Sequence, residues 1–184
     1  FATTTGSRLL DVLVGSPHFR LGAPHGLAAD ATMLAIADSG AGLVHVLELE
    51  KRRYRVIEAA GKTPFECPVG VATGGRGDLF VADAALARVF RLSSHGQLLE
   101  EIEEKFVRPT GVAYDAPRQL LHVVDAGAHA VLTFRQAEGR WTLLRRVGGR
   151  GEGAGTFNFP THAAVDREGR LCVADSLNHR VQRF

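Results

Sequence analysis

The chain has 184 residues, of which 45% are hydrophobic and 23% charged, and its formal net charge is +2. These proportions are ordinary for a globular domain and exclude a low-complexity chain. The small net charge and the lack of a strong Lys/Arg cluster argue against a nucleic-acid partner. No apolar run approaches the roughly 18 residues that span a bilayer, so we expect no membrane span.

The chain begins at Phe1, without Met and without the charged and apolar regions of a signal peptide. We therefore expect a processed protein or a fragment of a longer one. The two cysteines, Cys67 and Cys172, show neither a Cys-x-x-Cys nor a Cys/His spacing, so the sequence predicts no zinc site and no other cofactor. Two lone thiols do not reveal the redox compartment.

One pattern occurs four times along the chain. Each copy begins at a Pro that is followed two residues later by Gly or, in the last copy, by His162. The copies start near residues 24, 68, 109 and 160. About fourteen residues after each Pro comes an Asp: Asp38, Asp83, Asp125 and Asp175. Successive copies of this Asp are 45, 42 and 50 residues apart, and periods of this length are typical of repeat architectures.

Each copy reads as short apolar strands separated by turn formers. A fourth strand is predicted at residues 54–57, 98–102 and 141–147, and the same element opens the chain at residues 9–14. The segment 97–105 has weak helical spacing, but its place in the repeat predicts a strand. Four short antiparallel strands in about 45 residues make one propeller blade. We predict an all-β, β-propeller domain over residues 1–184, in which residues 1–23 carry the last strand of a preceding blade.

Recurrent residues have structural interpretations in this scheme. Gly26, Gly70 and Gly111 are expected where the first strand approaches the crowded axis and a Cβ would clash. The four repeated Asp residues are expected to accept hydrogen bonds from turn amides, or from Arg88 and Arg180 five residues later. The Gly-rich segment 148–155 lacks the Lys-Ser/Thr end of a phosphate loop, and we interpret it as a flexible connection between blades.

The last copy resembles an NHL repeat. The resemblance rests on Gly153-Ala-Gly-Thr-Phe157, Pro160, Asp166 and the run Gly169–Phe184, with the signature pair Asn178-His179. It extends more weakly over the whole chain, since only His129 of the pair is kept in the third copy. The resemblance implies a β-propeller, usually of six blades, and the pattern is similar to six-bladed NHL-type proteins of proteobacteria, which implies the bacterial cell envelope or periplasm.

Four repeats are fewer than six, and two interpretations remain open. The chain is either an open part of a six-bladed propeller, whose unpaired blades could drive self-association, or a closed four-bladed ring in which the strand at 9–14 completes the last blade. The first interpretation is favoured because the wedge angles of blades differ between four-fold and six-fold rings.

Few residues are candidates for metal binding or catalysis. The resemblance implies that histidines at the propeller mouth bind metal in NHL-type enzymes such as amidating lyases, and His25 and His162 occupy such positions. The other copies supply Val69 and Thr110 there, so no metal site is predicted. His122 lies within a predicted strand and is expected to be a satisfied core or interblade residue. No convergent catalytic set appears.

The sequence therefore favours a non-enzymatic scaffold that binds a protein, peptide or glycan through its rim loops and central mouth. The candidate contact residues stand at first-strand starts and blade turns: His25, Arg88, His129, Thr161, His162, Asn178 and His179. The alternatives are a metal-dependent lyase or lactonase of propeller type and, more weakly, RNA binding through a basic face.

Overall fold

The structure is a computed structural model, and it describes residues 21–75 and 77–184. The strand predicted at residues 9–14 lies outside the described residues. In the part of the chain that is described, no helix is long and apolar enough to span a membrane.

Four antiparallel sheets follow one another along the chain, each with its strands in simple sequential order. Blade 1 contains β1 (Pro24–Ala29), β2 (Met33–Asp38), β3 (Leu43–Glu48) and β4 (Arg53–Ile57). A short hairpin then comes, β5 (Ala59–Ala60) and β6 (Thr63–Pro64). Blade 2 contains β7 (Pro68–Gly74), β8 (Asp78–Asp83), β9 (Arg88–Ser93) and β10 (Leu98–Glu101). Blade 3 contains β11 (Pro109–Asp115), β12 (Leu120–Asp125), β13 (Ala130–Ala137) and β14 (Arg140–Gly148). Blade 4 contains β15 (Pro160–Val165), β16 (Leu171–Asp175), the 3₁₀ turn η1 (Ser176–Asn178) and β17 (Arg180–Arg183).

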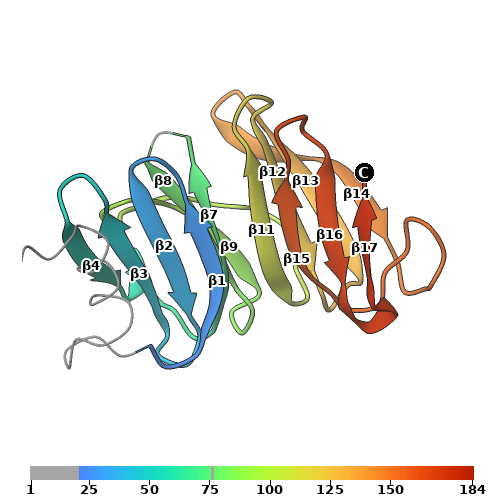
Figure 1. The fold of residues 1–184 in the computed structure, drawn as a ribbon, viewed down its shortest axis with the longest axis horizontal. Helices are drawn as coiled ribbons and strands as arrows, with labels where there is room; N and C mark the ends of the chain where they lie inside the picture. Colours follow the sequence, from blue (N-terminus) through green and yellow to red (C-terminus); the bar gives the residue numbers. More distant parts are fainter. Residues whose placement is uncertain (1–20, 76) are drawn as a thin grey trace, which may run out of the picture.

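The blades are set radially, as the predicted all-β propeller requires, and the fold class is confirmed (Figure 1). Each first strand lies innermost, and β1, β7, β11 and β15 pack in succession. The segment around Leu98 is a strand, so tertiary context overrides its weak helical spacing. In each blade the register of the first two strands pairs the repeat Pro with the repeat Asp, as in Pro68 with Asp83.

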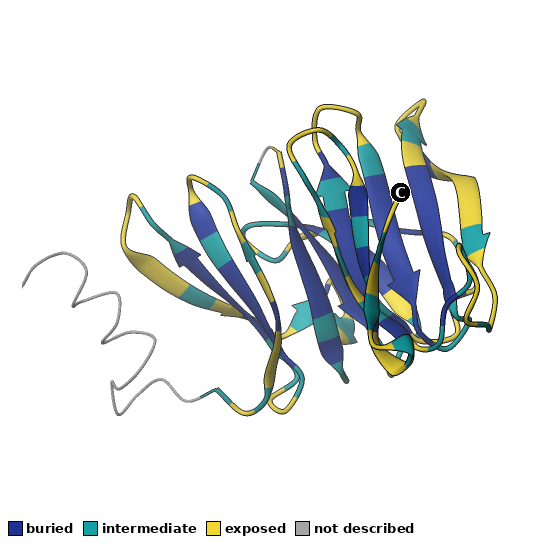
Figure 2. Cartoon of the chain, turned by 45° about the vertical axis from the view of Figure 1, so that its right-hand side comes forward, coloured by how far each residue is buried: buried dark blue, intermediate teal, exposed yellow. Residues whose placement is uncertain are grey.

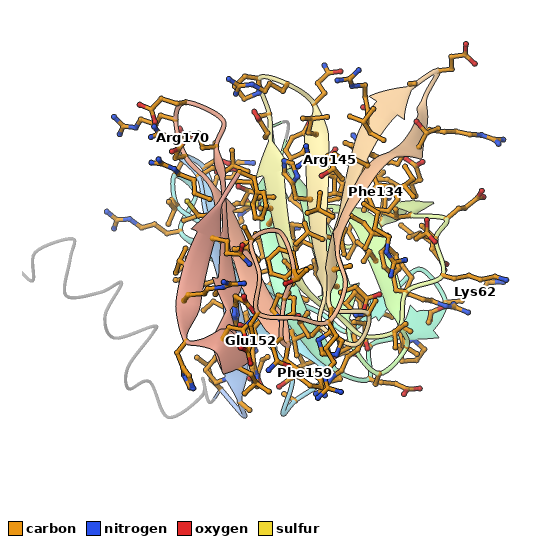
Figure 3. All side chains as sticks on the ribbon, turned by 90° about the vertical axis from the view of Figure 1, so that its right-hand side faces the viewer. Lys62, Phe134, Arg145, Glu152, Phe159 and Arg170 are labelled. Carbon is orange, nitrogen blue, oxygen red and sulfur yellow. The ribbon has the colours of Figure 1, made fainter. Side chains whose placement is uncertain are left out.

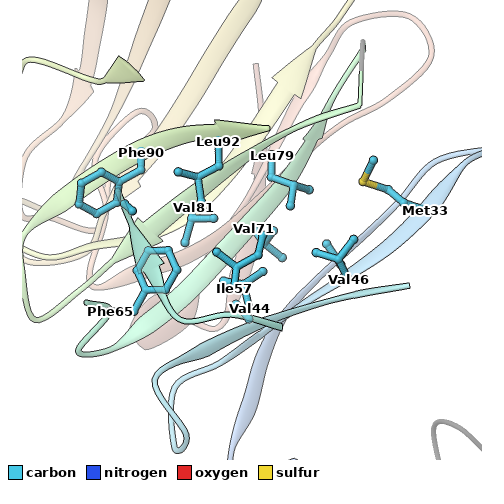
Figure 4. Packing of buried hydrophobic residues seen from close by; sticks show 13 residues of the cluster. Met33, Val44, Val46, Ile57, Phe65, Val71, Leu79, Val81, Phe90 and Leu92 are labelled. Atoms are coloured by element: carbon cyan, nitrogen blue, oxygen red, sulfur yellow. The ribbon is translucent and has the colours of Figure 1, made fainter. Parts of the chain in front are cut away.

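Alternating side chains of neighbouring blades form the core. Between blades 1 and 2, Val44, Val46 and Met33 of one sheet meet Leu79 and Val81 of the next (Figure 4). A second cluster of buried side chains joins blades 2 and 3, and a third joins blades 3 and 4. Figure 2 shows the buried residues gathered on the middle strands of blade 1 and on the inner strands of blades 2 and 3, with fewer in blade 4. Each buried Val, Leu or Phe side chain contributes about 1.5–3 kcal/mol, so the sheets depend on their neighbours for stability.

The outward faces of the first and last blades remain accessible to solvent. Leu27 of β1 is 68% exposed and Val181 of β17 is 69% exposed. An interface of the kind that joins the other blades would bury both side chains. The described residues therefore favour the open series of blades over a closed four-bladed ring.

The repeated glycines set the spacing of the inner strands. A Cβ on Gly26 would lie 2.6 Å from Val69 O, one on Gly70 would lie 2.7 Å from Thr110 O, and one on Gly111 would lie 2.8 Å from Thr161 O. The carbonyl in each case belongs to the residue just before the corresponding position of the next blade. The expected close approach at the axis is thus confirmed, with the next blade's backbone as the obstacle.

We predict that Gly70→Ala lowers the free energy of unfolding by about 1–3 kcal/mol, because the added methyl group forces two backbones apart. Denaturant unfolding of the purified chain measures this. Gly153→Ala is the matched control, since the nearest atom to its Cβ would be Thr156 Oγ1 at 3.8 Å. Equal stability of the two variants would contradict the axial constraint.

Candidate functional site

The two ends of the blades differ in chemistry. At one end the second strand of each blade finishes at Asp38, Asp83, Asp125 or Asp175, and we call this the Asp end. The opposite end carries the turns between the first and second strands, and we call it the hairpin end. Figure 3 shows Phe159 and Glu152 at the Asp end of blade 4 and Arg170 at its hairpin end.

Each repeat Asp is almost completely buried, at 0–1% exposed, and accepts hydrogen bonds from backbone amides of its own blade. Asp125 shows the pattern. Its carboxylate accepts from Val107 N and Arg108 N, each at 2.8 Å, and from Ala128 N at 3.0 Å. The Asp125 carboxylate thereby joins the segment that leads into the first strand of the blade to the turn that follows the second strand.

The same arrangement recurs at Asp38 and Asp83. Burial alone would raise the pKa of Asp38. Three backbone amides donate hydrogen bonds to its carboxylate and the His45 ring is hydrogen-bonded to it, and together they hold the pKa below the ordinary value of 3.8. Arg88 does not join this arrangement. Its Nε lies 3.4 Å from Glu101 instead. The ion pair expected between Arg88 and Asp83 is therefore replaced by a surface pair.

Blade 4 modifies the pattern. Asp175 accepts from Asn158 N at 2.7 Å, but the next amide, Phe159 N, donates to Nδ1 of His129 in blade 3 at 3.1 Å. The rings of His129 and Phe159 meet edge to face, with centroids 4.5 Å apart. Both residues have positive φ, 52° and 49°. Blades 3 and 4 are thus joined at the Asp end by a histidine.

Three side chains of its own blade donate further hydrogen bonds to Asp175. Asn178 Nδ2, Arg180 Nε and Gln182 Nε2 donate to its Oδ2 at 2.9, 2.8 and 3.2 Å. Burial alone would raise the pKa of Asp175, but the Asn158 amide and the Asn178 and Arg180 side chains outweigh it and hold the pKa below its ordinary value.

The same three side chains hold the Gly-rich connection. Asn178 donates to Gly151 O, Arg180 donates to Glu152 O, and Gln182 donates to Thr156 O. The segment 148–155, which we expected to be a flexible connection, is therefore fastened to blade 4 at several points. Asn178 and Arg180 of the signature serve this internal network.

The seven candidate contact residues all lie at the Asp end. His25, Arg88, His162 and His179 are exposed, and His129, Thr161 and Asn178 are partly buried. His25 Nδ1 is 2.8 Å from Ser39 Oγ, and Thr161 Oγ1 is 2.7 Å from Ser176 Oγ. Ser39 and Ser176 each directly follow the repeat Asp, a position that sequence reasoning passed over.

No metal centre forms among residues 21–75 and 77–184, since no three His, Cys, Asp or Glu side chains there could hold one ion together. His122 is buried in blade 3 with Nδ1 3.0 Å from Thr133 Oγ1. Cys67 and Cys172 are both free and partly buried. Burial and the nearby Asp83 raise the pKa of the Cys67 thiol despite Arg108, which makes it a poor nucleophile.

Radial antiparallel blades with innermost first strands define the described chain as a four-blade β-propeller. Residues 157–184, which include blade 4, match the family model of the NHL repeat. Over 153 residues the sequence is 27% identical to the peptidylglycine alpha-amidating monooxygenase of Rattus norvegicus. That match covers 76% of this chain and only 16% of the relative, so the chain spans about a sixth of its length.

Solved structures share the fold. One is a chain of a nidogen/laminin complex, with a TM-score of 0.68 and 22% identity, covering 89% of this chain and 60% of that one. A streptogramin B lyase has a TM-score of 0.69 at 11% identity, covering 91% and 56%. A gluconolactonase from Xanthomonas campestris has a TM-score of 0.64 at 19% identity, covering 87% and 61%. At these identities the likeness establishes the fold alone.

We predict that Asp125→Ala lowers the free energy of unfolding by about 3 kcal/mol, because it leaves three amides without their acceptor. Asp166→Ala is the control. Asp166 also accepts turn amides, from Glu168 and Arg170, but that turn is exposed and water can replace the carboxylate. A loss at Asp125 no larger than the loss at Asp166 would contradict the role of the buried carboxylate.

Stability should also depend on His122. Burial lowers the pKa of His122 below 6.5, and Arg145 adds to this effect while Asp115 opposes it. The unfolded chain therefore takes up this proton first as the pH falls below 6.5, and stability decreases until the folded-state pKa is reached. For one proton the slope is at most about 1.4 kcal/mol per pH unit.

Urea unfolding at several pH values between neutrality and the mildly acidic range tests this. The slope should become smaller in His122→Gln, whereas His95→Gln, at an exposed turn position, should leave it unchanged. An unaltered slope in His122→Gln would show that another group carries the dependence.

Proposed function

We propose that this propeller is a binding module whose Asp end binds a protein, peptide or glycan partner. The observation that carries the proposal is the common location of the seven contact residues at one end of the blades. His25, Thr161 and His162 lie at the starts of β1 and β15, Arg88 begins β9, and the other three lie in turns. The buried Asp carboxylates hold the backbone segments next to these positions. Exposed side chains on a firmly held backbone are typical of binding surfaces.

We further propose that the blades belong to a six-bladed propeller of a bacterial protein. The NHL-repeat match of blade 4 and the open series of blades support this. The chain covers 56–61% of the matched lyase, lactonase and nidogen-complex chains, which leaves room in those chains for additional blades.

A metal-dependent lyase or lactonase is the second candidate. It is favoured by the likeness to an amidating monooxygenase and by the folds of a streptogramin B lyase and a gluconolactonase. In this chain His25 and His162 would be the mouth ligands, and further ligands would have to come from elsewhere. Stoichiometric metal that is lost in both His25→Ala and His162→Ala would favour this candidate over the binding module.

The binding proposal is tested by selecting ligands for the immobilised chain from a displayed peptide library and from a glycan array. We expect selected ligands to lose affinity by at least about ten-fold in Arg88→Ala and His162→Ala, because both side chains are exposed at the Asp end. Arg167→Ala, an exposed change at the hairpin end, is the control. Ligands whose affinity depends on Arg167 alone, or the selection of no ligand, would refute the proposal.

A further inference from the structure

A second candidate site lies at the other end of the molecule. A cavity of about 280 Å³ opens between blades 2 and 3, lined by residues of β7, β8 and β9 on one side and of β11, β13 and β14 on the other. Its walls include the turn residues Gly75 and Gln119 and therefore belong to the hairpin end. None of the seven contact residues of the Asp end takes part.

One wall of the cavity is aromatic. Trp141 meets Phe80 edge to face, with ring centroids 5.4 Å apart, and Tyr114 lies 5.1 Å from Phe80. Glu100 of blade 2 accepts a hydrogen bond from Trp141 N at 3.2 Å, which fixes the tryptophan across the blade boundary. The indole is only 6% exposed, and its Nε1 is a buried donor without a partner in the described chain. Buried indole N–H groups usually have an acceptor.

Among the other described lining residues, the polar side chains together carry no net charge. Arg91 donates from Nε and Nη2 to Asp78 Oδ2 at 2.9 and 2.5 Å, so the two charges compensate each other. The side-chain amides of Gln119 and Gln136 also line the cavity, and neither makes a hydrogen bond within the described chain. Each amide offers both a donor and an acceptor.

Gln119 occupies an unusual position. Its φ is +54°, whereas the turns of blades 2 and 4 have Gly77 and Gly169 at the corresponding place, with φ of 81° and 82°. A glutamine is less suited than glycine to this region of backbone space. Its side chain is nevertheless part of the cavity wall.

We propose that this cavity binds one ring of a neutral saccharide. Sugar hydroxyls both donate and accept, as the two amides and the Arg91–Asp78 pair require, and the C–H groups of a sugar ring pack against the partly exposed Tyr114. The lining residues that the structure describes carry no net charge for an anion, and a purely apolar ligand would leave the amides unpaired. The volume lies just below the range of cavities for drug-sized ligands, which suits a single ring.

The chain contains a single tryptophan, so Trp141 fluorescence reports directly on the cavity. The purified chain is titrated with glucose, galactose, mannose, N-acetylglucosamine, maltose and cellobiose, with glucuronate as the charged probe. We expect a saturable change in emission with at least one neutral sugar and none with glucuronate. Calorimetry on the same samples confirms that the change reports binding.

The variants make the test specific. Gln119→Gly combined with Gln136→Ala should weaken binding at least about ten-fold, equivalent to about 1.4 kcal/mol. Glycine suits the backbone at residue 119, so the variant removes the amide without strain. Ala87→Gly is the matched control, because Ala87 also has a positive φ, 54°, but lies outside the cavity.

Three results would overturn the proposal: no saturable binding of any neutral sugar, binding of glucuronate alone, or equal affinity of the double variant and the Ala87→Gly control. None of them bears on the Asp end, where the test uses Arg88 and His162.

Discussion

A buried carboxylate in each blade is the interaction on which the Asp end of this propeller depends. In blades 1 to 3 the Asp side chain accepts hydrogen bonds from amides of the segment leading into its blade and of the turn between the second and third strands. At Asp125 these are the amides of Val107, Arg108 and Ala128. Leaving such amides unpaired in a buried place is costly, so the carboxylate fixes where the chain enters each sheet. Because its lone pairs are engaged in this way, it is poorly suited to bind a metal or to act as a base.

The buried carboxylates hold the backbone at the Asp end, and the side chains of His25, Arg88, His162 and His179 at the same end are exposed. His25, Arg88 and His162 lie at the starts of strands next to the segments that the carboxylates hold, and His179 lies in a turn. The hairpin end is built differently, since a cavity lies there between blades 2 and 3. One fold thus offers two surfaces of different chemistry, a rim of separate polar side chains and a recess with an aromatic wall.

The repeat pattern of the sequence was sufficient to predict the strands, the blades and the close approach of Gly26, Gly70 and Gly111. These features depend on local alternation and on residues that recur at a fixed period. The contact between His129 and Phe159 could not be predicted, because it joins two blades and requires a left-handed backbone at both residues. The cavity was missed for a similar reason. Gln119, Gln136 and Trp141 converge only when blade 3 packs on blade 2, and no sequence period links them to Asp78 and Arg91.

His162 has a geometric consequence for the symmetry of the assembly. At the three boundaries within the chain, a missing Cβ lets the backbone of the next blade come so close that even a methyl group would lie 2.6–2.8 Å from its carbonyl oxygen. Blade 4 has a full imidazole side chain at this position, and His162 is exposed. A sheet that packs on this face, from whichever molecule, must stand farther from the axis or be rotated relative to blade 4. His162 is thus the one departure from the glycine spacing that the other three blades share at this position.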